Sequence, residues 1–184
     1  MSRIIIGVDV DDVTANLVDA WLHVYNEEYN DGVSQQDIKS WAISEHVKCG
    51  QNIYKYLRYP ELYNIVQPVE KAKWGIDCLR EMNFRIVFIT ASTPEQSGRK
   101  YKWLLDYWMI QDKKDYVEAM DKSLINVDYL IDDNPENVVG TSGHGIIFTK
   151  EWNKELMGYP RVDGWEEIVK YFIQIVNTRE ITGV

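Results

Sequence analysis

Cysteine is scarce in this sequence, with only Cys49 and Cys78 among 184 residues. The two form neither a CxxC pair nor a zinc-ligand spacing, and they are too few for a disulfide-stapled secreted scaffold. Long apolar runs are also missing, because the N-terminal run at residues 4–8 stops at Asp9 and is much too short to span a bilayer. We therefore expect a reduced, cytoplasmic protein with no membrane partner.

Positive charge is in deficit: 20 Lys and Arg stand against 29 Asp and Glu, a net charge of −9. A chain without a basic field does not hold a nucleic-acid duplex, so we expect no polymeric nucleic acid as a partner. Disorder is excluded as the main state, because 45% of the residues are hydrophobic and only 27% are charged. The length suits one core with an insertion.

Internal repeats and Pro- or Gly-rich linkers are absent as well, so the apolar pattern decides the organisation. A β-branched run at 3–8 predicts a buried strand, residues 14–30 predict a helix, and short helical pieces follow at 33–67. Beyond Pro68, we expect strands at 85–89, 116–119, 129–131 and 145–148, helices after 68, around 101–108 and from 164, and a loop at 137–145. This alternation predicts an α/β fold with a parallel sheet and helices on both faces.

Polar residues follow the predicted strands, and in open parallel sheets ligands bind at the carboxyl ends of strands. These ends carry Asp9, Asp11 and Asp12, then Thr90 and Ser92, then Asp132 and Asp133, with Lys122 in the loop before the last pair. Two like charges 4 Å apart repel by roughly 4 kcal/mol at an effective dielectric near 20, so the acids need a cation. Oxygen ligands without nearby His or Cys favour Mg²⁺, whose remaining positions a phosphate can fill.

This set of residues suits aspartate-based phosphoryl transfer. Asp9 can attack phosphorus and form an acyl-phosphate. Asp11, two residues further on, can protonate the leaving oxygen and later activate water. Thr90, Ser92 and Lys122 can then hold the phosphate oxygens, whose charge Mg²⁺ and the ammonium group neutralise.

Several fragments of the chain resemble motifs of the haloacid dehalogenase-like phosphatases. Residues 5–14 resemble the first motif, 87–90 the second, and 121–122 with 127–133 the third and fourth. More narrowly, the fragments REM at 80–82, KYKW at 100–103, DK at 121–122, LIDD at 130–133 and IFT at 147–149 are similar to the 5'(3')-deoxyribonucleotidases. The resemblance implies a Rossmann-like core at 1–13 and 68–184, a small helical cap at 14–67, and Mg²⁺-dependent dephosphorylation of deoxyribonucleoside monophosphates.

By matching positions, the resemblance makes Asp9 the nucleophile and Asp11 the acid/base. It implies that Asp9, the backbone carbonyl of Asp11 and the Asp133 carboxylate bind Mg²⁺, with Asp132 ordering a metal-bound water. The sequence departs from the family pattern at three places: Asp12 stands where Gly is usual, Asn134 stands where a basic residue is common, and Thr90 and Ser92 both fit the position of the phosphate-binding hydroxyl.

Aromatic residues crowd the predicted cap. They are Trp21, Trp41, Tyr54, Tyr56, Tyr59 and Tyr63. These rings either pack the cap or stack on a nucleobase, and we expect Tyr63, together with Leu17, to line the substrate pocket. Exposed aromatics on the cap or core would also favour a homodimer.

Two alternatives to a nucleotidase stay open. The first is a phosphatase of the same superfamily that acts on another small phosphate ester. The second is a phospho-accepting, receiver-like signalling domain, which also combines acids, a Thr and a Lys on a parallel sheet. The receiver requires a phosphorylated Asp at the end of a third strand, and no such strand is predicted between Asn30 and Pro68.

Overall fold

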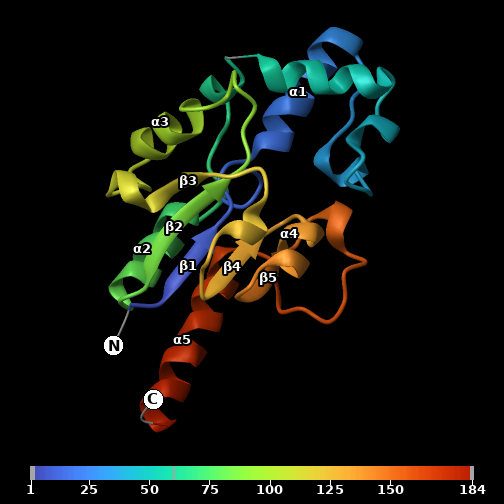
Figure 1. Cartoon of the computed structure of the whole chain (residues 1–184). Helices are drawn as coiled ribbons and strands as arrows, with labels where there is room; N and C mark the ends of the chain where they lie inside the picture. The colour runs from blue at the N-terminus through green and yellow to red at the C-terminus, as the bar shows by residue number, and fades with distance from the viewer. Residues whose placement is uncertain (1–2, 60, 183–184) are drawn as a thin grey trace.

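The computed structural model describes residues 3–59 and 61–182, with side chains described as far as 178. In this part of the chain, six parallel strands form one sheet in the order β3-β2-β1-β4-β5-β6 (Figure 1). The strands are β1 Ile5–Val8, β2 Arg85–Thr90, β3 Tyr116–Glu118, β4 Tyr129–Asp132, β5 His144–Phe148 and β6 Arg161–Val162, and the α-helices are α1 Leu17–Tyr29, α2 Ala72–Glu81, α3 Arg99–Asp106, α4 Pro135–Gly140 and α5 Trp165–Thr182. The predicted α/β class is confirmed.

The sheet is buried because its strands are apolar on both faces. In β2, Ile86 and Phe88 belong to the main core, to which α2, α3 and α5 also contribute. Val87 and Ile89 belong to a smaller cluster on the opposite face. Successive side chains of one strand therefore pack on different sides of the sheet.

The part of the chain between β1 and α2 lies mainly beyond the arrowheads of the strands, and its residues 18–56 supply most of a separate hydrophobic cluster (Figure 1). After α1 it consists of the short 3-10 helices η1 Gln35–Asp37, η2 Ile43–Glu45, η3 Gly50–Arg58 and η4 Leu62–Asn64. The chain enters and leaves it side by side, because Ala15 bridges to Pro68 and the Val69 amide donates to the Thr14 carbonyl at 2.8 Å. The division into a core and a cap at 14–67 remains a prediction.

Two segments near the end of the chain differ from expectation. The predicted loop at 137–145 contains most of α4, whose start is fixed by the Asn134 side chain, which accepts the Glu136 amide at 2.9 Å, and by Pro135 in the first turn. The two-residue strand β6 was not predicted either, because a pair of residues carries no periodic signal. Within the described ranges, no helix is both long and apolar enough to cross a membrane.

Helix boundaries also differ. The helix predicted from residue 14 begins at Leu17, because the preceding residues form a tight turn. In the helix predicted around 101–108, Tyr101, Leu104, Leu105 and Trp108 have the spacing of one helix face. Leu104 is buried, but Leu105 is 45% exposed. Trp108 is 79% exposed, because α3 ends before it at Asp106.

Candidate active site

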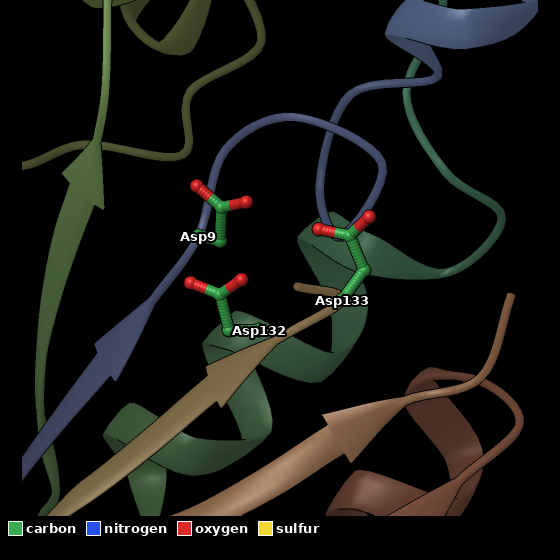
Figure 2. A group of neighbouring side chains, drawn as sticks. All are labelled: Asp9, Asp132 and Asp133. Atoms are coloured by element: carbon green, nitrogen blue, oxygen red, sulfur yellow. The ribbon is translucent and has the colours of Figure 1, made fainter. Parts of the chain in front are cut away.

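Three buried carboxylates meet where β1 and β4 end (Figure 2). Val8 lies beside Ile131 in the sheet, so Asp9 and Asp132 follow on neighbouring strands and Asp133 comes next. One oxygen from each carboxylate lies within 4.8 Å of the others. The ends of two parallel strands thus concentrate negative charge in a space that water barely reaches.

Lys122, in the 3-10 helix η6 Lys122–Leu124, supplies the positive charge beside these acids. Its Nζ lies 2.6 Å from Asp9 Oδ1 and 2.7 Å from Asp132 Oδ2. Burial by itself would lower the pKa of Lys122, but the two carboxylates outweigh it and the pKa is raised. The ammonium group therefore stays charged at neutral pH.

The acids themselves carry more charge than Lys122 can balance. Burial raises the pKa of Asp9 to about 7 against the attraction of Lys122, and burial and neighbouring acids raise the pKa of Asp133 well above its usual range. Three ionised carboxylates and one ammonium group leave a charge of −2. An oxygen-rich site with that charge fits one hard divalent cation such as Mg²⁺.

Asp132 and Asp133 have different hydrogen-bond partners. Both oxygens of Asp132 are occupied, Oδ1 by the Asn134 amide at 2.9 Å and Oδ2 by Lys122, and Asn137 Nδ2 lies 3.1 Å from each. The described hydrogen bond to the Asp133 carboxylate engages Oδ2 alone, from Trp152 Nε1 at 2.9 Å. Asp133 therefore has the greater capacity to bind a metal.

Asp11 lies in a second group, apart from the three clustered carboxylates. Its Oδ2 accepts a hydrogen bond from Lys100 Nζ at 2.5 Å, and its Oδ1 accepts one from the Tyr63 hydroxyl. Lys100 projects from α3, is 3% exposed and also donates to Thr90 Oγ1 at 3.0 Å. Burial and the nearby Asp11 raise the pKa of Tyr63 far above its usual range, so the phenol remains a donor.

Asp12 occupies the position where the family pattern has glycine. Its φ of 57° lies in the left-handed region, which glycine adopts freely and which Asp tolerates better than most residues. Its buried carboxylate accepts the Val18 amide at 3.2 and 3.3 Å and Gln35 Nε2 at 3.2 Å. The Asp12 side chain thus ties the β1 loop to the start of α1.

A cavity of about 260 Å³ lies beside Asp11, and we call it the Asp11 pocket. Its walls are mainly apolar and aromatic, and they include Leu17, Trp41, Tyr63 and Trp152. Leu17 and Tyr63 are the two residues that the sequence predicts there. The two candidate hydroxyls have different partners: Thr90 Oγ1 accepts a hydrogen bond from Lys100, whereas the buried Ser92 hydroxyl interacts with Tyr116.

Over residues 3–180 the chain matches the model of the family described as 5' nucleotidase, deoxy (pyrimidine), cytosolic type C protein. The chain belongs to this family. Membership confirms the predicted relationship to the 5'(3')-deoxyribonucleotidases and the predicted enzyme class, a phosphoric monoester hydrolase.

Relatives with established descriptions agree with this membership. A 5'(3')-deoxyribonucleotidase from Clostridium acetobutylicum is 29% identical over 169 residues, covering 91% of this chain and 93% of the relative. A 5'(3')-deoxyribonucleotidase from Bacillus subtilis strain 168 is 25% identical over 164 residues, covering 89% of this chain and 95% of the relative. The similarity therefore extends over nearly the whole length of both proteins.

Solved structures show the same fold at low sequence identity. A haloacid dehalogenase-like hydrolase from Burkholderia xenovorans has a TM-score of 0.59 at 10% identity, covering 95% of this chain and 98% of that one. A HAD hydrolase from Bacillus subtilis, described as bound to magnesium, has a TM-score of 0.59 at 14% identity, covering 93% and 99%. These likenesses confirm the haloacid dehalogenase-like architecture.

The sequence predicts no role for three residues that contact the candidate site: Lys100, Asn137 and Trp152. A signal for Lys100 exists, because it precedes the buried Trp103 and Leu104 by three and four residues and so shares their helix face. Asn137 and Trp152 carry no comparable signal, since their contacts depend on how α4 and the loop after β5 fold back.

Proposed function

We propose that this protein is a Mg²⁺-dependent phosphomonoesterase that dephosphorylates deoxyribonucleoside 5'- or 3'-monophosphates through an aspartyl-phosphate intermediate. The observation that carries the proposal is the buried Asp9 carboxylate, which is paired with Lys122, clustered with Asp132 and Asp133, and close to the aromatic Asp11 pocket. The descriptions of the relatives support this choice of substrate.

Asp9 is the proposed nucleophile. One carboxylate oxygen attacks phosphorus, the bond from phosphorus to the leaving oxygen breaks, and an acyl-phosphate remains on Asp9. Asp11 is the proposed acid/base: it protonates the departing oxygen and then takes a proton from the water that hydrolyses the acyl-phosphate. Lys100 and Tyr63 hold the Asp11 carboxylate in the wall of the pocket that would receive the leaving group.

Asp9, Asp133 and the backbone carbonyl of Asp11 are the proposed Mg²⁺ ligands, with Asp132 ordering a metal-bound water. The single hydrogen bond described for the Asp133 carboxylate supports its choice over Asp132. When bound, Mg²⁺ would neutralise phosphoryl oxygens that otherwise repel the attacking carboxylate. Lys122 would bind the same phosphate oxygens.

The phosphate-binding hydroxyl is proposed at Thr90, with Ser92 as the second possibility. Leu17 and Tyr63 would contact the leaving nucleoside in the Asp11 pocket. Small nucleotides are the proposed partners, and the free thiols of Cys49 and Cys78 support a reducing, cytoplasmic location. The homodimer remains a prediction. Family membership gives no support to the receiver-like alternative.

A phosphate-release screen tests this function. The panel contains all deoxyribo- and ribonucleoside 5'- and 3'-monophosphates together with sugar phosphates, each assayed with Mg²⁺ and with EDTA. We expect release from deoxyribonucleotides, loss of release in EDTA and recovery when Mg²⁺ is restored. Preference for a sugar phosphate would favour the other small-ester alternative, and full activity in EDTA would contradict the metal requirement.

A further inference from the structure

Residues 150–152 follow β5 and contact two parts of the molecule. One is the segment 35–41 of the predicted cap, and the other is Asp133 of the three clustered carboxylates. Three successive side chains each contact one residue of that segment: Lys150 Nζ lies 3.4 Å from Gln35 Oε1, Glu151 Oε2 lies 2.8 Å from Lys39 Nζ, and the Trp152 ring lies 6.2 Å from the Trp41 ring at 67°. These contacts fix Trp152 between the segment 35–41 and the sheet.

Trp152 and its neighbour hold Asp133 at two points. The Trp152 indole Nε1 donates to Asp133 Oδ2 at 2.9 Å, and Asn153 Nδ2 donates to the Asp133 carbonyl at 2.8 Å. Trp152 is only 8% exposed, so water has little access to replace its N–H group. Because the bond engages Oδ2, the rotation of the carboxylate is restrained and Oδ1 is the oxygen left for a ligand.

The same indole ring forms part of the wall of the Asp11 pocket. We propose that Trp152 is a positioning residue that orients the Asp133 carboxylate for Mg²⁺ through its N–H group while its ring closes the Asp11 pocket. This inference rests on the function proposed above. The two parts of the Trp152 side chain have different roles: the N–H group donates to the Asp133 carboxylate, and the ring lines the pocket.

Calorimetric titration of the metal-free protein with MgCl₂ tests the role of the N–H group. Trp152→Phe keeps an aromatic ring but removes the donor, and we expect Mg²⁺ affinity to fall by about 10- to 100-fold, the usual cost of losing such an outer hydrogen bond. Trp103→Phe is the matched control, because it removes a buried indole hydrogen bond of 3.0 Å that goes to the Val66 carbonyl and not to one of the three clustered carboxylates. Its Mg²⁺ affinity should equal that of the parent.

Turnover separates positioning from a purely structural role. High Mg²⁺ should restore kcat of Trp152→Phe, whereas Asp133→Asn should not recover. KM of Trp152→Phe for the nucleotide should stay above that of the parent, because the smaller ring no longer fills its part of the pocket wall. If the parent binds no Mg²⁺, the proposed function fails. If the parent binds Mg²⁺ and Trp152→Phe binds it equally well, the role of Trp152 is overturned.

A spectroscopic measurement on the parent covers the case in which Trp152→Phe does not fold. The indole N–H signal of Trp152 in a nitrogen–proton correlation spectrum is the one that Asp133→Asn displaces. It should shift when MgCl₂ is added, whereas the indole signal of Trp103 should not. If the Trp152 signal does not shift at saturating Mg²⁺, the inference is overturned.

Discussion

As the proposed nucleophile, Asp9 would have to be ionised to attack phosphorus, yet its surroundings oppose ionisation. Burial raises its pKa to about 7, with Asp132 and Asp11 adding repulsion and Lys122 acting against both. A carboxylate buried without compensation is more stable in its protonated form. The ion pair with Lys122 at 2.6 Å favours the ionised carboxylate, and the proposed divalent cation would add to this effect at neutral pH.

Replacing this one carboxylate tests the nucleophile. Asp9→Asn should lower phosphate release on the order of 10³-fold or more, because an amide cannot form the acyl-phosphate. The fold should persist, since the retained Oδ1 can still accept from the Val10 amide at 2.7 Å and from Lys122. Steady-state phosphate release and the melting temperature check both parts, and activity within about tenfold of the parent would reject the assignment.

Individual site residues differ in how far the sequence predicts them. Asp9, Asp132 and Asp133 could be placed together, because the ends of adjacent parallel strands share one edge and a strand fixes the residue that follows it. Lys100 and Trp152 could not be placed by the same reasoning. Their contacts depend on the packing of α3 against β2 and on a loop whose path the local sequence does not determine.

Among the elements, α2 and α5 pack closely enough to require glycine at one position. A Cβ built on Gly75 of α2 would lie 2.4 Å from Trp165 Cε3, at the start of α5. The Trp165 indole in turn donates to the Val13 carbonyl at 2.9 Å, in the loop that carries the acids. The α2–α5 pair therefore stabilises the loop after β1 through the hydrogen bond from Trp165.

Gly75→Ala should destabilise the protein although alanine is the better helix former. The propensity gain of about 1 kcal/mol is smaller than the cost of overpacking, typically about 1–3 kcal/mol, because the near neighbour is a buried indole ring. Urea denaturation of the metal-free protein measures the difference. Gly140→Ala is the control, since its Cβ would meet only Ser123 at 3.7 Å, and equal stability changes in the two variants would contradict the clash.

The elements were predictable where several signals coincided. β1 and β2 are apolar runs of normal length, and the alternation of strands with helices then indicates that the strands are parallel. The helix α4 was missed although Asn134 and Pro135 are a typical helix start, because the glycines and serine after them favoured a loop. The strand β6 depends on pairing with β5, which no local pattern encodes.

For the whole molecule, the buried acids make stability depend on pH in the absence of metal. Asp9 and Asp12 both have a pKa raised to about 7 by burial, and that of Asp133 is raised as well. A carboxyl group raised on folding contributes its full stability below its unfolded pKa near 4, and this contribution is lost as pH rises towards 7. Surface acids whose pKa is lowered, such as Glu151, change the stability only at lower pH, where they become protonated.

The metal-free protein should therefore melt at a lower temperature at about pH 7.5 than at about pH 5, with a slope of up to about 1.4 kcal/mol per pH unit for each proton involved. Each kcal/mol corresponds to about 2–4 °C for a chain of this size. Mg²⁺ should reverse the trend, because it binds the ionised carboxylates and competes with the same protons, so its stabilisation should be larger at the higher pH. Thermal melts in EDTA and in MgCl₂ at both pH values give the four melting temperatures to be compared. An equal gain from Mg²⁺ at both would mean that the acids are already ionised at the lower pH and that Lys122 alone offsets their burial.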